Sequence, residues 1–550
     1  MFKYIKKEIL LVAIFATSFL IPIKSFSQSN DFQVIKNLEL MGEVFEQLEL
    51  YFVDDPETGK MGKHAIDAML KELDPYTVFY HESNIEDYRI MTTGQYGGIG
   101  SLIRKMGSHV CIVQPYENSP AVKGGLMAGD KILMIENKSM IDKSTDEVSS
   151  SLKGPKGTTI KIKILRDGVG EKDISITRDE IKIPDIPYHG IISDSIGYLK
   201  LNSFTNTAYA EVKKSYQNLK DKGMKKLIFD LRGNGGGLLI EAIKIVNLFV
   251  EQNQIVVTTK GRVESENKSY KTWMQPADLQ IPVVVLINGG SASASEIVSG
   301  SLQDLDRAVV IGNTSYGKGL VQRTYDLEYG CKVKLTVAKY YTPSGRCVQR
   351  LEYYDNDGAE KAKEVPDSLV KKFKTKNNRE VVDGRGIEPD VKIKQNSYSQ
   401  LTRKLIVDNV IFDFATKYRL ENDSISMPER YRFSDSEFDL FKDFLDNREF
   451  LYSNKSTEII NQLIAQSKKD SLYTYIKTDL DNALLKVKPS RERDLNIYKK
   501  EIMRTIENEI ISRYYFQKGK TINLFKYDPV ISEAISLLKD ENRYNAILGK

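Results

Sequence analysis

The stretch Asn288-Gly-Gly-Ser-Ala-Ser-Ala-Ser-Glu296 decides how this chain is interpreted. It follows an apolar run, Ile281 to Ile287, that is typical of a buried strand, and it precedes a helical pattern from Glu296 to Gln303. A tight turn between a strand and a helix exposes a side chain and leaves free backbone N–H groups beside it. A serine in this turn is therefore a candidate nucleophile. The alternative is a purely structural role, in which the three serines only compete to cap the helix.

The bulk composition indicates a globular chain of several domains. At 550 residues the chain is too long for one hydrophobic core, and 41% hydrophobic with 28% charged residues is ordinary for globular proteins. The net charge is +5, and part of it lies in the first 27 residues. The remainder is close to neutral, which gives no electrostatic reason to expect a nucleic-acid partner.

The histidines and cysteines predict neither a metal site nor a disulfide framework. The three cysteines are widely spaced, and a Cys331–Cys347 bridge is compatible with the sequence without being required by it. The four histidines lack metal-ligand spacing and lie outside the stretches that carry the chemistry. We therefore expect no metal and no cofactor. The histidines are His64, His81, His109 and His189.

The N-terminus has the pattern of a secretory signal peptide. Three of the first seven residues are lysines, and the apolar segment Ile9 to Ile23 is short for a membrane span of ~20 residues and contains Pro22. Small residues around position 25 predict cleavage after Ser27. The chain is therefore expected to be exported, with a periplasmic location. The alternative is an uncleaved signal anchor that tethers it to the membrane.

Changes in the spacing of apolar residues and glycines divide the rest into four segments and predict a multidomain α/β and α+β protein. Residues 28–93 and 397–550 have helical spacing, and we interpret the second as a helical extension that serves as a scaffold or in oligomerisation. Residues 94–184 contain short strands and glycine turns. Residues 185–396 alternate strands with helices, which predicts a mostly parallel sheet with functional loops at the carboxyl ends of its strands.

The order of elements in residues 94–184, opened by Gly97-Gly-Ile-Gly100, resembles a PDZ domain. In that family the glycine-rich loop offers backbone N–H groups to the terminal carboxylate of a peptide, which then adds to the sheet as a strand. The resemblance makes Gly97, Gly98, Ile99 and Gly100 the candidate peptide-binding residues. The alternative is that these glycines only form a tight turn. Arg166 or Arg178 is a candidate for coupling peptide binding to activity, or a plain surface charge.

Three stretches of residues 185–396 together contain the groups needed for acyl transfer. Ser293 is followed by the Ala294 N–H, and the glycines Gly235 to Gly237 let a backbone approach a ligand closely. A serine needs a base, and with no histidine nearby Lys318 is the available candidate. Burial can lower the pKa of a lysine from ~10.4 by up to 3–5 units. By itself, however, a lysine is more often an exposed surface residue.

This combination resembles the carboxyl-terminal processing peptidases, or tail-specific proteases, which are serine peptidases with a Ser-Lys pair. Six matching stretches occur in family order over roughly residues 60 to 396, and neither end of the chain carries a comparable match. The stretches are Gly97-Gly-Ile-Gly100, Asp230-Leu-Arg-Gly-Asn-Gly-Gly-Gly237, Ser291-Ala-Ser-Ala-Ser-Glu296, Gln303-Asp304, Tyr316-Gly-Lys-Gly319 and Gly386-Ile-Glu-Pro-Asp390.

The resemblance implies a role for each site residue. It makes Ser293 the nucleophile and Lys318 the general base, with Gln322 supporting the lysine. It leaves Ser295 with Glu296 to cap the helix, and we interpret Asp304 of the Gln-Asp pair as structural. The oxyanion hole is implied to consist of the N–H groups of Ala294 and of either Gly236 or Gly237.

The sequence therefore predicts a serine endopeptidase that binds C-terminal tails of exported proteins through its PDZ domain and cleaves them through an acyl-enzyme. A homodimer formed by the helical regions and an adaptor protein are further partners that the sequence leaves open. One rival is a non-catalytic PDZ scaffold, but every catalytic stretch is present. Another is a histidine-dependent esterase, which would require a Gly-x-Ser-x-Gly motif and a histidine after Ser293; both are lacking.

Overall fold

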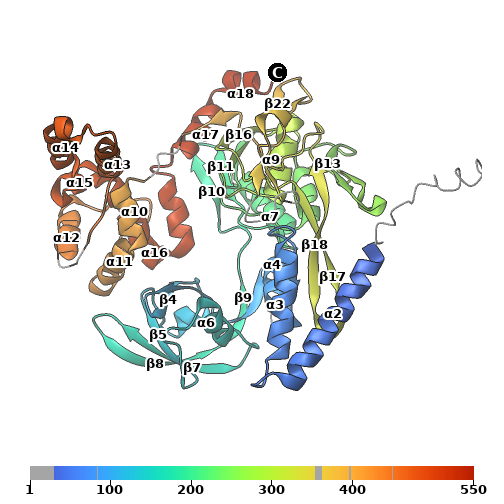
Figure 1. The fold of residues 1–550 in the computed structure, drawn as a ribbon. Coiled ribbons are helices and arrows are strands. Elements are labelled where there is room, and N and C mark those ends of the chain that lie inside the picture. Colours follow the sequence, from blue (N-terminus) through green and yellow to red (C-terminus); the bar gives the residue numbers. More distant parts are fainter. Residues whose placement is uncertain (1–29, 83–84, 354–361, 395–397, 447, 449) are drawn as a thin grey trace, which may run out of the picture. The chain divides into compact units, whose positions relative to one another are not determined.

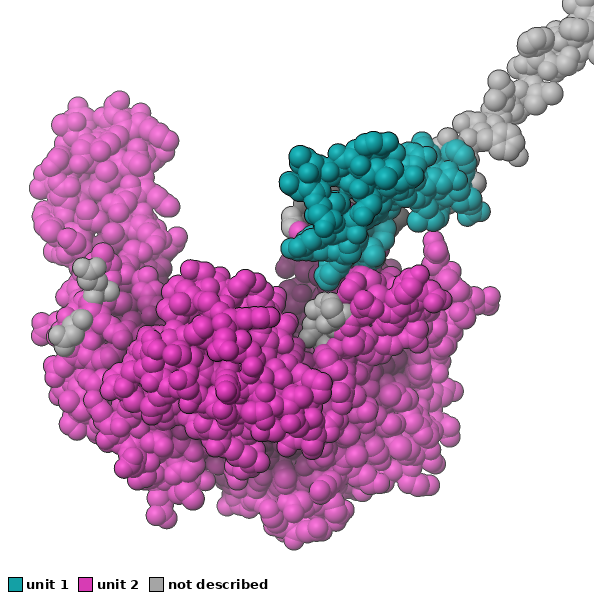
Figure 2. Space-filling model, turned by 90° about the horizontal axis from the view of Figure 1, so that it is seen from below, with its two compact units in different colours: residues 1–70 teal, residues 71–550 magenta. Residues whose placement is uncertain are grey.

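The computed structural model describes residues 30–550, apart from residues 83–84, 354–361, 395–397, 447 and 449. The predicted signal peptide, residues 1–27, lies outside the described residues. Within the described ranges, none of the helices is both long and apolar enough for a membrane span. The chain forms two compact units, one ending at Leu70 and the other comprising residues 71–550 (Figure 2).

The first unit contains the two helices expected near the N-terminus, α2 (Asn30–Tyr51) and α3 (Thr58–Lys71). Helix α2 carries apolar side chains that are largely exposed, with exposed fractions of 57% for Val34 and 65% for Leu38. Exposed side chains of this kind contribute little to the stability of a single chain, because burial is what stabilises apolar groups. Others on the same helix are Ile35, Met41, Val44 and Leu50.

Residues 95–182 form the predicted PDZ domain, which has its own buried core of aliphatic side chains (Figure 1). Its main sheet has the order β3-β4-β5-β7-β8, with the short β6 beside β5, and β3 lies at the edge. The two remaining strands, β2 and β9, pair with each other. The elements are β2 (Gln95–Gly98), β3 (Ser101–Met106), β4 (His109–Pro115), α5 (Pro120–Lys123), β5 (Lys131–Ile135), β6 (Lys138–Ser139), α6 (Thr145–Leu152), β7 (Thr159–Arg166), β8 (Gly170–Thr177) and β9 (Asp179–Lys182).

The sheet that organises the peptidase core is mostly parallel, as predicted. Its order is β10-β11-β12-β15-β16-β23, and every neighbouring pair is parallel except β10 with β11. Because β12, β15 and β16 are adjacent and parallel, the loops that follow them leave the same edge of the sheet. The strands are β10 (Tyr188–Ser193), β11 (Ile196–Lys200), β12 (Lys226–Asp230), β15 (Val283–Ile287), β16 (Val309–Gly312) and β23 (Val391–Lys392).

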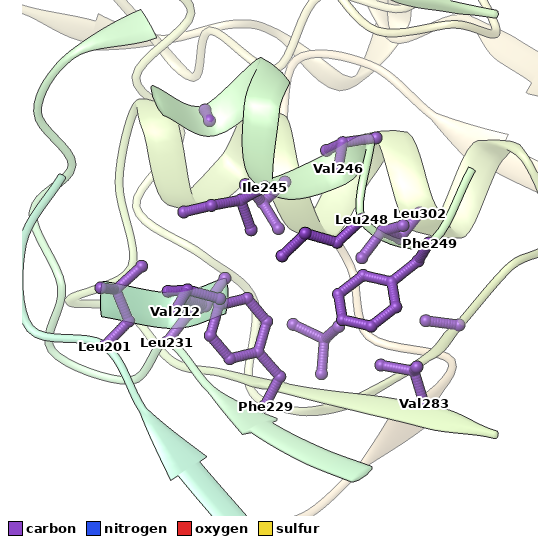
Figure 3. Packing of buried hydrophobic residues seen from close by; sticks show 14 of the residues in the cluster. Leu201, Val212, Phe229, Leu231, Ile245, Val246, Leu248, Phe249, Val283 and Leu302 are labelled. Atoms are coloured by element: carbon purple, nitrogen blue, oxygen red, sulfur yellow. The ribbon is translucent and has the colours of Figure 1, made fainter. Parts of the chain in front are cut away.

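Apolar side chains cover both faces of this sheet, and successive residues of a strand alternate between them. On one face, Phe229 and Val283 pack with Leu302 beneath α7 (Ala208–Asp221), α8 (Leu239–Val246) and α9 (Ala294–Asp304) (Figure 3). On the other face, Ile228 and Val284 pack against side chains of α17 (Pro529–Lys539) and α18 (Glu541–Ile547). Residues 397–550, which we expected to form one helical extension, therefore also supply one layer of the peptidase core.

A second sheet is antiparallel and includes the two strands that follow Lys318 in sequence, β17 and β18. Strand β18 (Lys332–Tyr341) lies at its centre, and β1 (Val78–Tyr80), β13 (Ile255–Gly261) and β17 (Leu320–Asp326) all pair with it. Strand β14 (Lys268–Lys271) pairs with β13. The sequence analysis did not predict β1, which lies within a region interpreted as helical, before α4 (Ile85–Thr93). This strand brings N-terminal residues to the peptidase core.

The remaining helices form a domain with a separate, aromatic-rich core that includes Phe414, Phe438 and Phe441. Helix α16 contains a kink at Phe516, where φ is 51°. All three cysteines are free, so the Cys331–Cys347 bridge that the sequence permitted does not form. The helices are α10 (Gln400–Val407), α11 (Val410–Glu421), α12 (Asp435–Asp446), α13 (Lys455–Lys469), α14 (Tyr473–Val487), α15 (Arg491–Ile497) and α16 (Lys499–Leu524).

Candidate active site

Ser293 occupies a strained backbone position at the start of α9. Its φ of 54° and ψ of −113° lie outside the regions that non-glycine residues ordinarily adopt. Strain of this kind persists where the surrounding structure enforces it, and it is concentrated at functional sites. The Ser293 side chain contributes to the wall of a cavity of about 430 Å³.

The two flanking serines are buried and bind the neighbouring loop. Ser291 Oγ donates to the Leu231 carbonyl, and Ser295 Oγ donates to the Asn234 carbonyl, each at 2.8 Å. The expectation that Ser295 caps α9 is therefore wrong, because Ser293 itself holds the N-cap position. Sequence alone could not distinguish the three serines, since the carbonyls that bind two of them lie about sixty residues away in sequence.

The glycine loop that follows β12 lies directly against Ser293. Gly236 has a φ of +104°, and a Cβ at this position would lie 2.9 Å from Ser293 Cβ and 3.0 Å from the Ala294 nitrogen. The Gly236 N–H donates to Asn234 Oδ1 at 2.9 Å. Within the described ranges the N–H groups of Gly237 and Ala294 donate no hydrogen bond, and both residues line the cavity. Of the two glycines considered for an oxyanion hole, Gly237 is therefore the one with an available donor.

Lys318 lines the same cavity, on the loop between β16 and β17. Its ammonium lies 4.1 Å from the centre of the Tyr76 ring. Burial, helped by the nearby charge of Lys334, lowers the pKa of Lys318 to about 8. The flanking Gly319 is required sterically, because a Cβ there would lie 2.7 Å from the Gln349 nitrogen. The structure thus brings a serine and a lysine of lowered pKa to one cavity.

Gln322 also lines the cavity, but its amide has a different partner from the predicted one. Its Nε2 donates to Thr336 Oγ1 at 3.1 Å. Among the described contacts, Lys318 Nζ forms no hydrogen bond with Gln322 or with Ser293 Oγ. Gln322 therefore lines the same cavity as Lys318 but forms no hydrogen bond that would orient the lysine amine.

Glu296 connects the serine turn to the lysine loop, a role that the sequence analysis missed. Its carboxylate is fully buried and accepts hydrogen bonds from the Ser293 N–H at 2.8 Å and the Lys318 N–H at 2.9 Å. Ser315 Oγ at 2.5 Å and the Gly317 N–H at 2.7 Å are the other two donors. Burial raises the pKa of Glu296 in spite of these four bonds. The only sequence signal was a glutamate at the third position of a helix.

The segment just before β1 places Tyr76 against Lys318. The Asp74 carboxylate accepts from the backbone N–H groups of Tyr76 and Thr77, both at 2.8 Å, and from Thr77 Oγ1 at 3.0 Å. These bonds hold Tyr76 against Lys318, where its ring helps to keep water from the amine. The sequence analysis placed this segment in a region of helical spacing and did not assign it to the site.

Asp304 lies outside the cavity and binds structural partners. It forms a fully buried ion pair with Arg346 at 2.7 Å and accepts hydrogen bonds from Thr342 Oγ1 and the Ser344 N–H. These bonds fasten the end of α9 to the segment after β18. The arrangement agrees with the structural role expected for Asp304.

The glycine loop of the PDZ domain precedes the edge strand β3. Gly97 and Gly98 belong to β2, and the Ile99 carbonyl accepts from the Ala121 N–H at 2.8 Å. Among the described strands β3 pairs only with β4, so its other edge is open for a further strand. The Gly100 φ of +75°, where a Cβ would also lie 2.6 Å from Ser119 Cβ, accounts for the glycine that ends the loop.

Arg166 and Arg178 are both engaged within the PDZ domain. Arg166 forms an ion pair with buried Asp130 at 2.7 Å. Arg178 donates to the Leu152 and Ser151 carbonyls at the end of α6. They are therefore not the plain surface charges that the sequence permitted, and these partners, all within the domain, give no support for a coupling role beyond it.

Comparison with known proteins identifies the same three parts of the chain. The model of Peptidase family S41 matches residues 195–354, a PDZ domain model matches residues 112–166, and the model named "Probable PDZ-protease, C-terminal helical domain" matches residues 401–538. The carboxy-terminal-processing protease of Bartonella bacilliformis is 36% identical over 352 residues, which cover 63% of this chain and 80% of that protein.

Two further relatives have related names. The carboxy-terminal processing protease CtpA of Bacillus subtilis is 32% identical over 313 residues, covering 57% of this chain and 66% of that protein. The solved photosystem II D1 C-terminal processing protease is 24% identical, with a TM-score of 0.36, and the match covers 65% of this chain and 92% of that one.

The chain belongs to peptidase family S41 and is a serine-type protease. Within that family it is a carboxy-terminal processing protease with a PDZ domain and a C-terminal helical domain. The predicted family, fold class and enzyme class are thereby confirmed. Among the described residues no group of His, Cys, Asp and Glu has the arrangement of a metal site.

Proposed function

We propose that this protease cleaves peptide bonds by a Ser-Lys mechanism with Ser293 as nucleophile and Lys318 as general base. The observation that carries the proposal is their position on one cavity, beside the glycine loop, with the lysine amine largely removed from water. A desolvated lysine can be neutral near physiological pH and can then accept a proton. Glu296, through the N–H groups of Ser293 and Lys318, fixes the separation of the two loops.

In the first step, Ser293 Oγ attacks the carbonyl carbon of the substrate while its proton passes to Lys318 Nζ. The oxyanion that forms accepts hydrogen bonds from the N–H groups of Ala294 and Gly237. The intermediate then collapses: the C–N bond breaks, the Lys318 ammonium returns its proton to the leaving amine, and Ser293 remains acylated. A water molecule deprotonated by Lys318 attacks the ester, which releases the new carboxylate and restores the serine.

The PDZ domain is proposed to bind the C-terminal tail of the substrate. Support comes from the open edge of β3, which follows the loop Gly97 to Gly100, and from α6, which contacts β3. A peptide that adds to β3 would place its terminal carboxylate near the N–H groups of Gly98, Ile99 and Gly100. Titration of a fluorescent peptide with a free terminus, against the same peptide amidated, tests this mode, since only the free acid should bind tightly.

Export to the periplasm is proposed from the signal sequence alone, and cleavage after Ser27 should leave residue 28 as the mature N-terminus. N-terminal sequencing of protein recovered from periplasmic and membrane fractions tests this, because an uncleaved anchor would leave the full chain in the membrane.

A homodimer through α2 is proposed because its apolar side chains are exposed in the single chain. Sedimentation of the mature chain, and of a variant with Leu38 and Val34 changed to Ser, distinguishes dimer from monomer.

The catalytic assignment is tested by Ser293→Ala in the purified mature chain. Hydrolysis of a peptide with an apolar C-terminus should fall to background, while binding of that peptide to the PDZ domain is retained as the control for folding. Mass spectrometry of the wild type with an ester substrate should find the acyl group on Ser293. The assignment is wrong if the variant still cleaves. Retained binding with no turnover by the wild type would instead favour a scaffold.

The base is tested by the pH dependence of kcat/KM. Lys318 must be neutral to accept a proton, so activity should rise with pH, tenfold per unit below the pKa of about 8, and level off above it. Lys318→Arg should remain inactive throughout, because a guanidinium keeps its proton. A flat profile between pH 6 and 9 would contradict the assignment.

A further inference from the structure

The cavity that contains Ser293 and Lys318 holds a second lysine, Lys334 of β18. The contacts described for its ammonium are weak. Nζ lies 3.8 Å from Met91 Sδ and 5.8 Å from the centre of the Tyr80 ring. A thioether sulfur is a poor hydrogen-bond acceptor and carries no charge. Among the described side chains, no carboxylate forms an ion pair with Lys334.

Two other lysines on the same strand differ from Lys334, because each has a carboxylate partner. Lys332 pairs with Asp326, and Lys339 lies 3.2 Å from Glu352. Lys334 has Asp74 as its nearby acid, but that carboxylate already accepts three hydrogen bonds from Tyr76 and Thr77. Burial lowers the pKa of Lys334, and the charge of Asp74 opposes this only in part. Lys334 is thus a partly desolvated cation that forms no ion pair within the described part of the chain.

The cavity that holds this cation has a mixed lining. Its apolar side chains include Leu238, Leu239 and Ile297, the last one turn after Ser293 in α9. Beside Lys334 lie Met91 and Thr324, the residue of β17 that pairs with it. A peptide at the site would therefore meet both apolar side chains and a positive charge.

We propose that Lys334 is a specificity residue that binds a carboxylate of the substrate close to the cleaved bond. The inference rests on the proposed function of the cavity as the site of peptide cleavage. An ammonium that has lost water gains most from an ionised partner, because charge-assisted hydrogen bonds are stronger than neutral ones. The carboxylate can be the side chain of an aspartate or glutamate, or the terminal carboxylate of a short tail; both offer the same chemistry.

The test uses a peptide that the wild type cleaves, with the cleaved bond located by mass spectrometry. Matched peptides carry Glu or Gln at each position within four residues of that bond, and a parallel series has a free or amidated C-terminus at increasing distance. At one position, or at one tail length, the carboxylate form should be cleaved with a kcat/KM about tenfold or more above its neutral counterpart. The first series identifies a side-chain carboxylate and the second a terminal one.

Lys334→Met should abolish this preference, and Lys334→Glu should reverse it in favour of a Lys-containing peptide. Lys339→Met, on the same strand but outside the cavity lining, is the matched control and should keep the wild-type ratio. The proposal is overturned if the wild type shows no carboxylate preference in either series, a result that depends on no variant being folded. It is also overturned if Lys334→Met keeps the wild-type ratio.

The two proposals fail in different ways. Cleavage that Ser293→Ala abolishes, but that shows no carboxylate preference, contradicts only the role of Lys334. Cleavage that persists in Ser293→Ala contradicts the catalytic assignment and, with it, the inference about Lys334.

Discussion

The two loops that border Ser293 are each held by a buried carboxylate, but in opposite ways. Asp230, at the start of the glycine loop, is paired with Arg232 at 2.7 Å, and Arg232 also binds Asp528 of the C-terminal helices at 2.6 Å. Glu296, at the lysine loop, forms no ion pair among the residues that the structure describes and is held by four uncharged donors. The glycine loop therefore depends on an ion-pair network, and the lysine loop on hydrogen-bond geometry.

The pKa values of the two carboxyl groups differ accordingly. Burial alone would raise the pKa of Asp230, but the charges of Arg232 and Lys200 outweigh burial and hold it well below its usual range. For Glu296 burial dominates and raises the pKa. The backbone and hydroxyl donors to Glu296 position the lysine loop without adding a charged group to it.

The largest effect is expected for Glu296→Gln. Glutamine keeps one acceptor oxygen but turns an NH₂ group toward two of the four donors, at least one of which is a backbone N–H, so one or two of the four bonds are lost and the connection between the two loops is weakened. We expect kcat/KM to fall by ~10²- to 10³-fold, comparable to the loss of an oxyanion donor, and the melting temperature to fall as buried donors lose their partners.

Glu241→Gln is the matched control, because Glu241 is also buried but lies outside the cavity lining and binds the Tyr209 N–H and Lys244. It should lower stability and leave kcat/KM within a few-fold of the wild type. Equal kcat/KM values for the two variants would show that Glu296 serves stability alone.

The next effect is expected for Gly236→Ala, which tests the glycine loop directly. The added Cβ would lie within 3.0 Å of both Ser293 Cβ and the Ala294 nitrogen, at a φ that favours glycine. Displacement of the loop should lower kcat by ~10²-fold, since the oxyanion donors lose their geometry. Gly235→Ala is the control: its Cβ meets nothing within 4 Å, so kcat should change little. A Gly236→Ala enzyme with normal kcat would place the oxyanion hole elsewhere.

A smaller effect is expected for Asp528→Asn, which removes one member of the ion-pair network. Arg232 keeps its ion pair with Asp230 in this variant. The free energy of unfolding should therefore fall by about 1–3 kcal/mol, less than the ~3–5 kcal/mol that is typical when a buried charge loses its only partner. Urea denaturation measures it, and Asp540→Asn, at another helix N-cap without an ion pair to Arg232, provides the reference. If both variants lose the same stability, the contribution is helix capping and not the ion pair.

The last effect is expected for Lys318→Met, measured as stability. The folded-state pKa of about 8 lies below the ~10.4 of an unfolded lysine, so the unfolded chain binds more protons between these values. The wild type should therefore gain stability as pH rises from 8 to 10.4, and the inactive variant should not. At pH 7 the variant should be more stable by about 3 kcal/mol, since each unit of pKa difference corresponds to ~1.4 kcal/mol. A pH-independent difference in unfolding free energy would show that Lys318 is not desolvated.

The site could be located from the sequence through the resemblance to a known family, and the parallel strands explain why its parts meet. Ser293, the glycine loop and Lys318 lie in the loops after β15, β12 and β16, and adjacent parallel strands place such loops at one edge of the sheet. The small residues between a strand and a helix also predicted a tight turn at Ser293, but not its strained backbone.

The contributions that the sequence did not predict come from long-range contacts. Tyr76 reaches Lys318 only because β1 pairs with β18, whose paired residues lie about 250 positions away in the chain. Glu296 was interpreted as a cap, since its four donors come from two loops that meet only in the folded chain. The packing of α17 and α18 against the peptidase sheet was not predicted for the same reason. Their apolar pattern predicts a packed helix but does not indicate which core the helix packs against.

The packing of α17 and α18 against the peptidase sheet has a consequence for how the enzyme is made. Strands β11, β12, β15 and β16 present apolar side chains on a face that these two helices cover, and the entire helical domain is synthesised between β23 and α17. Until those residues have been made, Arg232 also lacks Asp528. Contacts between segments so distant in sequence form late in folding. A nascent chain would thus carry Ser293 and Lys318 through most of translation before its peptidase fold is complete, which delays proteolytic activity until synthesis is nearly finished.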